Sequence, residues 1–229
     1  MIVLVGDTRS HKNVALLKGL GWGRMRVLNM TKVFDGEPWA LDNGAFGAWR
    51  GGRPFDAVGF RKRVAKTLAM PAPFMCVLPD IVAGGLESLA LSLRWLAELP
   101  ASLPWYLVVQ DGMTVEDVEP HVGRVAGLFL GGTDAFKATA NVWAELAHRH
   151  GRAFHFGRAA SIPKIQAALA SGCDSLDTCF PLWTNERMVL FQRLVEGGTL
   201  TEAERAQYHR RGARKTGERV PAGQMKLVM

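Results

Sequence analysis

Eight short apolar runs alternate with stretches of helical periodicity along most of this 229-residue chain. Runs of three to five residues bounded by glycine, proline or aspartate are typical of buried strands. We predict strands at 2–5, 25–28, 39–41, 74–78, 105–109, 128–130, 153–156 and 175–177. Helices are predicted between them at 13–20, 56–68, 86–99, 115–122, 135–150 and 162–171. This alternation predicts an α/β fold, a compact (β/α)8 TIM-type barrel, with a doubly wound open sheet as the alternative.

Polar or glycine residues stand at the ends of several predicted strands. They are Asp42, Asp80, Gln110, Gly131 and Asp177. In a (β/α)8 barrel the active site lies at the carboxyl ends of the strands, so we expect these residues to lie together. The short apolar run that contains the last predicted strand carries two carboxylates, Asp174 and Asp177, shortly before Pro181 ends regular pairing.

Composition places the chain among ordinary globular proteins, with 48% hydrophobic and 21% charged residues. We expect a barrel over residues 1–196 and a C-terminal helix with a basic tail over 197–229. The short apolar start and the three unpaired cysteines predict no signal peptide, no membrane span and a cytoplasmic location. A net charge of +7 suggests a polyanionic partner, although much of the excess lies at 209–219, which a solvated tail would equally explain.

Four stretches of the chain resemble one enzyme family, in the family's order. The run Gly172-x-Asp174-x-x-Asp177-x-x-x-Pro181 resembles the nucleophile segment of the tRNA-guanine transglycosylases, which exchange guanine for a 7-deazaguanine. The other three are Asp42-Asn43-Gly44-Ala45-Phe46, Pro79-Asp80, and Val109-Gln110-Asp111-Gly112 followed by Leu130-Gly131-Gly132. Within that family, the chain most resembles shortened, phage-type members linked to 7-deazaguanine modification of DNA. If the chain is encoded by a phage, we expect it to act in the host cytoplasm.

The resemblance implies a role for each matched residue. Asp177 would hold C1′ of the sugar covalently while the base leaves, and Asp42 would move the proton to and from the purine. The base would be bound by Asp80, Gln110, Gly131, Gly132 and Phe46. Asp42-Asn43-Gly44 is also a common turn sequence, and Pro79-Asp80 is also a common helix cap, so structural roles are the alternatives.

The chain also departs from the family pattern. No cysteine follows Cys179, so the family's zinc-binding lobe is missing, and we expect neither bound metal nor cofactor. Lys137 stands near the position of a family glutamate, which leaves recognition of the 7-substituent open. Lys137, His155 and Arg158 are candidates for phosphate or sugar contacts. Trp22, Trp39, Trp49 and Trp183 are candidates for a stacking platform or for core residues.

These observations predict exchange of guanine in a polynucleotide for a 7-deazaguanine base, through a glycosyl-aspartate. DNA is preferred as partner over tRNA, because the zinc lobe is absent and the basic segment 209–215 can neutralise phosphates of any strand. Two alternatives remain: a barrel enzyme for a free nucleoside or sugar phosphate, with Gly131-Gly132 as phosphate site, and a non-catalytic nucleic-acid-binding subunit. The sequence leaves the oligomeric state open.

Overall fold

The computed structural model describes residues 1–27 and 33–206, and within them eight parallel strands form a closed barrel in chain order. The strands are β1 (Ile2–Gly6), β2 (Gly23–Arg26), β3 (Ala40–Leu41), β4 (Met75–Val77), β5 (Trp105–Val109), β6 (Gly127–Leu130), β7 (Ala153–Phe156) and β8 (Ser175–Asp177). The predicted (β/α)8 fold is therefore confirmed. The open-sheet alternative is wrong, because β1 pairs with β2 on one side and with β8 on the other.

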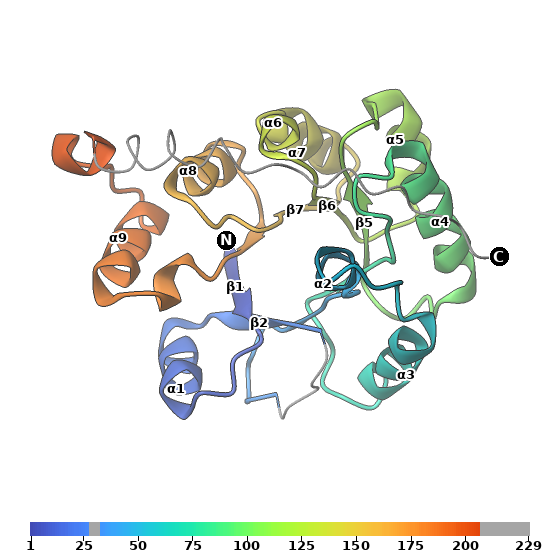
Figure 1. Ribbon diagram of the computed structural model, residues 1–229, viewed down its shortest axis with the longest axis horizontal. Coiled ribbons are helices and arrows are strands. Elements are labelled where there is room, and N and C mark those ends of the chain that lie inside the picture. The colour runs from blue at the N-terminus through green and yellow to red at the C-terminus, as the bar shows by residue number, and fades with distance from the viewer. Residues whose placement is uncertain (28–32, 207–229) are drawn as a thin grey trace. The chain divides into compact units, whose positions relative to one another are not determined.

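Helices follow the strands and form an outer ring around the barrel (Figure 1). They are α1 (His11–Leu20), α2 (Ala45–Arg50), α3 (Ala57–Thr67), α4 (Gly85–Glu98), α5 (Val115–Val122), α6 (Asp134–Lys137), α7 (Ala140–Arg149), α8 (Ile162–Ala170) and α9 (Asn185–Val195), with a 3₁₀ turn at Phe180–Leu182. None of the helices in the described part of the chain is long and apolar enough to cross a membrane. In Figure 1 the short helix α2 lies inside the ring formed by the other helices.

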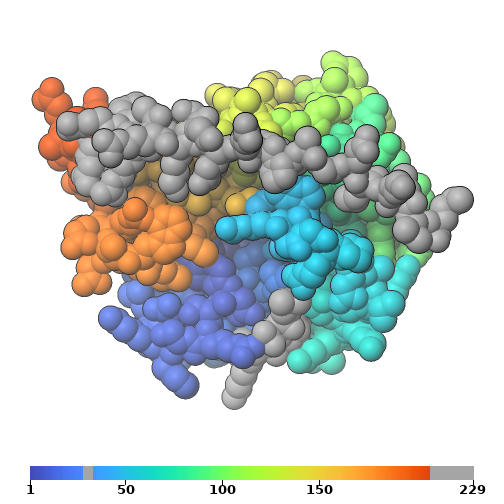
Figure 2. All heavy atoms as spheres, viewed as in Figure 1, coloured from blue at the N-terminus to red at the C-terminus, as the bar shows by residue number. Residues whose placement is uncertain are grey.

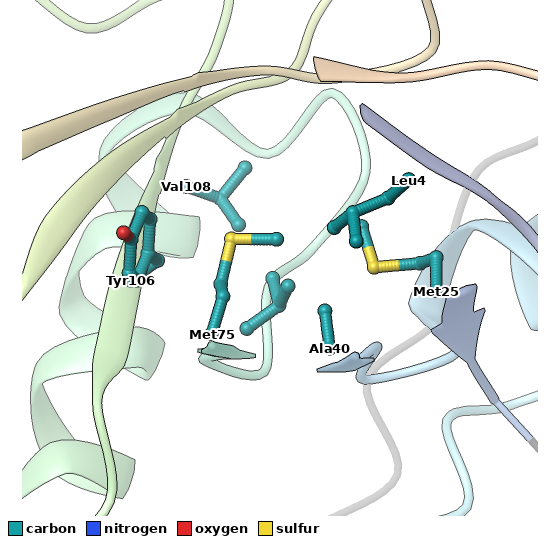
Figure 3. Packing of buried hydrophobic residues seen from close by; sticks show 7 residues of the cluster. Leu4, Met25, Ala40, Met75, Tyr106 and Val108 are labelled. Atoms are coloured by element: carbon teal, nitrogen blue, oxygen red, sulfur yellow. The ribbon is translucent and has the colours of Figure 1, made fainter. Parts of the chain in front are cut away.

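Apolar side chains from five neighbouring strands fill the barrel interior (Figure 3). The cluster consists of Leu4, Met25, Ala40, Met75, Val77, Tyr106 and Val108. Because successive side chains of a strand alternate between its two faces, these residues point inward while their chain neighbours pack against the helices. This packed interior supports the strand ends at which the polar residues stand.

Strand β2 carries two buried arginines, although its sequence Gly-Arg-Met-Arg does not predict that they are buried. Arg24 donates to both carboxylate oxygens of Glu37, at 2.6 and 2.8 Å, and Arg26 donates to the same carboxylate at 3.1 Å. Two cations thus share one buried carboxylate, which ties the segment before β3 to β2. The predicted strand 25–28 begins earlier, at Gly23, and its last residue lies outside the described residues.

One helix prediction was wrong, and two helices of the structure, α2 and α9, were not predicted. The single helix expected at 135–150 is divided into α6 and α7 at Ala138 and Thr139, where the Thr139 hydroxyl donates to the Phe136 carbonyl oxygen at 2.6 Å. Helix α2 was not predicted, since Gly47 and the following Gly51-Gly52 are typical of a loop. In the turn that leads into it, the Asp42 and Asn43 side chains accept the backbone N–H groups of Gly44 and Ala45.

The chain divides into two compact units, Met1–Phe191 and Gln192–Met229. All eight strands belong to the first unit. In the second unit residues 202–206 are helical, and the predicted basic tail at 209–219 lies outside the described residues. The boundary expected at residue 197 stays a prediction.

Glycine at position 127 is required by the packing of β6. A Cβ atom there would overlap the Tyr106 ring and lie 2.6 Å from the Ala153 carbonyl oxygen, whereas one at Gly123 would meet nothing within 4 Å. We therefore expect Gly127→Ala to lower the free energy of unfolding by about 1–3 kcal/mol. Gly123→Ala is the matched control, because its φ of −62° suits alanine. Urea denaturation measures both variants, and equal stability of the two would contradict this account of the barrel.

Candidate active site

Asp177 is the last residue of β8 and lies at the mouth of the barrel, the end at which the carboxyl termini of the strands meet. Its carboxylate accepts the Arg158 backbone N–H at 2.8 Å and contacts His155 Nε2 at 3.1 Å. The side chain is 16% exposed, so it is held on one side and remains accessible on the other. Asp174, which the sequence placed on the same run, precedes β8 and contacts His148 and the Phe154 N–H at the opposite end of the strand.

His155 lies beneath Asp177 inside the barrel and is fully buried. Its Nδ1 lies 2.8 Å from Ser175 Oγ, and its ring stacks on Phe129 with centroids 4.7 Å apart. Burial lowers the pKa of His155, against the opposing effect of Asp177, so we assign a neutral ring. Nε2–H then donates to Asp177 while the Ser175 hydroxyl donates to Nδ1. The predicted sugar or phosphate contact would need His155 to be exposed, and its position indicates an effect through Asp177 instead.

Lys137 contacts the peptide unit that binds Asp177. The side chain of Lys137 is buried, and its Nζ donates to the Gly157 carbonyl oxygen. The N–H of the same peptide unit is that of Arg158, which donates to Asp177. A cation at one end of a peptide and a carboxylate at the other polarise it in the same direction, so the two hydrogen bonds strengthen each other. Burial lowers the pKa of Lys137 to about 8, which leaves it mostly protonated at neutral pH.

These donors decide the charge of Asp177. Burial alone would raise its pKa, but the hydrogen bond from His155, the Arg158 N–H and the charge of Lys137 together hold the pKa below its ordinary value. Asp177 is therefore ionised at neutral pH. An ionised carboxylate that is accessible on one side is suited to act as a nucleophile or to stabilise a cation.

Asp42 follows β3, and its environment has the opposite effect. Burial raises the pKa of Asp42 to about 6, and the negative charge of Asp177 adds to this rise. The Gly44 N–H, which donates to the carboxylate at 3.0 Å, only partly offsets it. The mouth thus holds two carboxyl groups with separated pKa values, the arrangement that lets one act as an anion and the other as an acid or base.

A third carboxylate, Asp80 at the end of β4, is connected to both sides of the mouth. Asn43 Nδ2 donates to Asp80 at 2.7 Å and to the Leu78 carbonyl oxygen at 2.6 Å. Gln110 Nε2, at the end of β5, lies 3.4 Å from the other Asp80 oxygen. Burial raises the pKa of Asp80 to about 6, so it can exchange a proton near neutral pH or accept hydrogen bonds as an anion.

Gln110 has little hydrogen-bonding capacity left for a ligand. Its Nε2 also donates to Ser88 Oγ at 2.7 Å and to the Ile81 carbonyl oxygen at 2.9 Å, and its Oε1 accepts the Ala83 N–H at 2.7 Å. The residue therefore shapes the segment between β4 and α4, where Ala83 has a positive φ of 59°. That Gln110 binds a base edge stays a prediction, and its contacts favour an action through Asp80.

The Gly131-Gly132 turn after β6 is held by Asp111, which follows Gln110. The Asp111 carboxylate accepts the Thr133 N–H at 2.7 Å and the Thr133 hydroxyl at 2.6 Å. Gly132 has a φ of 77°, and a Cβ there would lie 2.5 Å from Asp111 Oδ2, so only glycine fits. The turn thus already holds an anionic side chain, which the sequence motif did not indicate.

Phe46 on α2 meets Arg158 from the end of β7. The Arg158 guanidinium carbon lies 3.5 Å from the centroid of the Phe46 ring, a close cation–π contact. Arg158 has a φ of 55°, which is uncommon for a residue with a side chain and aims its N–H at Asp177. A base that stacks on this face of Phe46 has to displace the guanidinium.

The structure brings together most of the residues that the sequence proposed. Asp42, Asp80 and Asp177 follow or end strands at the same mouth. The Gly157–Arg158 peptide connects Lys137 to Asp177, because its carbonyl oxygen accepts from Lys137 and its N–H donates to Asp177. Sequence reasoning missed Asn43, Ser175 and Asp111, although Asn43 and Asp111 each follow a predicted site residue directly. In residues 1–27 and 33–206, no group of three or more His, Cys, Asp or Glu side chains is arranged to hold a metal ion.

Comparisons with known proteins add a likeness of fold. No family model matches the chain, and no curated protein matches it. Among solved structures, the crystal structure of a citrate lyase from Burkholderia xenovorans LB400 is similar, with 15% sequence identity and a TM-score of 0.48. The similarity covers 96% of this chain and 93% of that chain.

The raised pKa of Asp42 predicts a pH-dependent effect on stability. Because the folded-state pKa of about 6 exceeds the usual value of 3.8, ionised Asp42 destabilises the fold above pH 6 and does so no longer below about pH 4. Asp42→Asn should therefore raise the free energy of unfolding at pH 7.5 by about 1–2 kcal/mol and change it little at pH 4. Asp35→Asn, which removes a carboxylate from an exposed turn, is the control. A stability gain for Asp42→Asn that is independent of pH would contradict the assignment.

Loss of the Lys137 charge should be measurable at Asp177. Lys137→Met removes the cation from the Gly157 carbonyl oxygen, so we expect the pKa of Asp177 to rise. Carbon-13 NMR titration of the carboxyl groups measures that pKa directly. Lys164→Met removes an equal charge from an ion pair with the exposed Asp134 and serves as the control. An unchanged Asp177 pKa in Lys137→Met would show that the shared peptide transmits nothing.

Proposed function

We propose that the chain is a base-exchange transglycosylase. It replaces guanine in a polynucleotide by a 7-deazaguanine derivative, and the polynucleotide that we propose is DNA. The observation that carries the proposal is the contrast between two carboxyl groups at one mouth. Asp177 accepts the Arg158 N–H and contacts His155 Nε2, which favours its ionised form, whereas burial raises the pKa of Asp42 to about 6. A double displacement at a sugar carbon needs such a pair, one ionised nucleophile and one proton carrier. The resemblance of the surrounding motifs to the tRNA-guanine transglycosylases supplies the substrate class.

In the proposed first step the Asp177 carboxylate attacks C1′ of the target nucleotide. The bond from C1′ to the guanine nitrogen breaks, its electron pair passes to the base, and protonated Asp42 gives that base a proton. Ionised Asp177 and protonated Asp42 are favoured together between their two pKa values. The sugar stays in the polymer as an ester of Asp177.

In the second step the incoming 7-deazaguanine reverses the first. Asp42, now ionised, takes the proton from the ring nitrogen of the incoming base, and that nitrogen attacks C1′ and releases Asp177. Ionised Asp80 is suited to accept N–H groups from the base edge, with Asn43 and Gln110 fixing its orientation. Phe46 would stack on the base after Arg158 has moved aside.

The two alternative functions receive less support. A phosphate site at Gly131-Gly132 would compete with Asp111, whose carboxylate already accepts the Thr133 N–H and hydroxyl. A non-catalytic subunit would have no use for buried carboxyl groups whose pKa values are near 6, which lower stability at neutral pH.

Exchange of labelled guanine into single-stranded DNA, duplex DNA and tRNA tests the proposal. Asp177→Asn should lower the rate by a factor of about 10²–10⁴ or more, because the neutral amide cannot form the ester. Asp174→Asn is the control, since Asp174 lies three residues earlier at the opposite end of β8 and should keep the wild-type rate. In the absence of incoming base, the wild-type protein should form a denaturation-resistant adduct with the polymer.

Two results would count against this function. If Asp177→Asn keeps more than about a hundredth of the wild-type rate, Asp177 is not the nucleophile. If labelled guanine enters tRNA and not DNA at the same salt concentration, the chain is a shortened tRNA enzyme.

A further inference from the structure

Two tryptophans are exposed although the chain buries its other five. Trp49 is 43% exposed and Trp183 is 54% exposed, whereas the remaining tryptophans are at most 8% exposed. Trp49 lies on α2, directly after β3, and Trp183 follows β8 and the 3₁₀ turn. The two exposed tryptophans therefore flank the strand ends that carry Asp42 and Asp177. Large exposed aromatic side chains near a site are typical of a binding surface.

The first exposed tryptophan belongs to an aromatic cluster that reaches Asp177, and we call Trp49, Phe46 and Arg158 the first platform. The rings of Trp49 and Phe46 lie 5.6 Å apart, and the Arg158 guanidinium lies 3.5 Å from the Phe46 centroid. The backbone of the same arginine donates to Asp177. A continuous series of contacts thus connects an exposed ring to the proposed nucleophile.

The second exposed tryptophan has the same companions, and we call Phe180, Trp183 and Arg187 the second platform. The two rings lie 6.1 Å apart, and the Arg187 guanidinium lies 5.0 Å from the Phe180 centroid and 4.6 Å from the Trp183 centroid. Phe180 is buried, and its N–H donates to Thr178, the residue after Asp177. The second platform is therefore anchored to the end of β8.

The segment that carries the first platform is positively charged, and the segment that carries the second is neutral overall but holds an arginine beside its rings. Residues 45–53 contain Arg50 and Arg53 and no acidic residue, and residues 178–187 contain Arg187 and a single carboxylate, Glu186. Both segments, cyan and orange in Figure 2, are visible on one face of the molecule. Exposed aromatic rings next to arginines fit a ligand that combines flat rings with negative charges.

We propose that the two platforms bind single-stranded nucleic acid, with bases near the target stacked on Trp49 and Trp183 and with Arg158 and Arg187 contacting phosphates. The inference rests on the proposed function and extends it from the exchanged base to the strand that carries it. Bases of a single strand have free faces that stack on tryptophan, whereas bases of a duplex are already stacked on each other. An arginine that leaves an aromatic ring for a phosphate exchanges a cation–π contact for an ion pair.

Binding of fluorescein-labelled oligo(dT) to the full-length protein tests the platforms without any exchange chemistry, because this oligonucleotide contains no guanine. We expect Trp49→Ala and Trp183→Ala each to raise Kd about 5- to 100-fold, the range for loss of one stacked base. Trp49→Phe and Trp183→Phe should restore most of the affinity, since phenylalanine also stacks. Wild-type tryptophan fluorescence should fall on binding, and less so in either alanine variant.

Arg61→Ala is the matched control for Arg187→Ala. The Arg61 guanidinium also lies over a tryptophan ring, 4.3 Å from the Trp95 centroid, but the two residues belong to the outer helices α3 and α4. Both variants lose one positive charge, so an equal loss of affinity would reduce the surface to non-specific attraction and overturn the proposal. Wild-type affinity in both tryptophan variants, absence of wild-type binding at low salt, or duplex binding as tight as single-strand binding would also overturn it.

The design separates this inference from the proposed function. If oligo(dT) binding depends on both tryptophans but no polymer accepts labelled guanine, the surface stands and the exchange activity is wrong. If guanine is exchanged while the alanine variants bind normally, the activity stands and the platforms are wrong. A parallel titration with oligo(rU) identifies the polymer, because a strong preference for it keeps the single-strand surface and replaces DNA by RNA.

Discussion

The pairing of β8 with β1 closes the barrel, and the candidate site depends on it. Ile2, Val3 and Leu4 pair with Ser175, Leu176 and Asp177, and the Thr178 N–H continues the ladder to the Leu4 carbonyl oxygen. This pairing makes neighbours of β1 and β8, although more than 160 residues separate them in the sequence. Without this contact β8 would pair with β7 alone and would leave its other edge open.

Barrel closure also explains how one mouth holds a carboxyl group with a lowered pKa, Asp177, and one with a raised pKa, Asp42. Asp177 is surrounded by donors from β7 and α6, namely His155, the Arg158 N–H and, through the shared peptide, Lys137. The pKa of Asp42 is raised mainly by burial and by the negative charge of Asp177, which outweigh the backbone N–H groups of Gly44 and Asn43 and the charge of Arg63. The number of donors around each group, together with burial that both share, separates their pKa values.

The buried polar residues near the mouth work mainly through one another. Gln110 and Asn43 both contact Asp80, and Asp111 holds the turn after β6 through Thr133. Such residues do not need to touch a ligand to matter, because each fixes the rotamer of a neighbour that can. The arrangement holds the carboxylates of several strands in one relative geometry while leaving Asp177 partly exposed.

The sequence by itself determined the barrel and most of the strand-end carboxylates. Apolar runs and helical periodicity are local properties, so β5 (Trp105–Val109), β7 (Ala153–Phe156) and β8 (Ser175–Asp177) were predicted at their observed bounds. The fold rule that active sites lie at strand ends then selected Asp42, Asp80 and Asp177. Motif resemblance named roles for them, and those roles stay predictions.

Tertiary structure alone decided which polar groups meet. The Asp42 and Asn43 side chains accept the N–H groups of Gly44 and Ala45 just before and at the start of α2, and Lys137 at the end of α6 donates to the Gly157 carbonyl oxygen. A periodicity argument detects neither contact. Neighbours distant in sequence also bury His155 and engage Gln110 in the segment between β4 and α4. They likewise decide that, of the tryptophans, Trp49 and Trp183 are the exposed ones. Hydrogen bonds, burial and the resulting pKa shifts are properties of pairs of residues, and barrel closure determines which pairs exist.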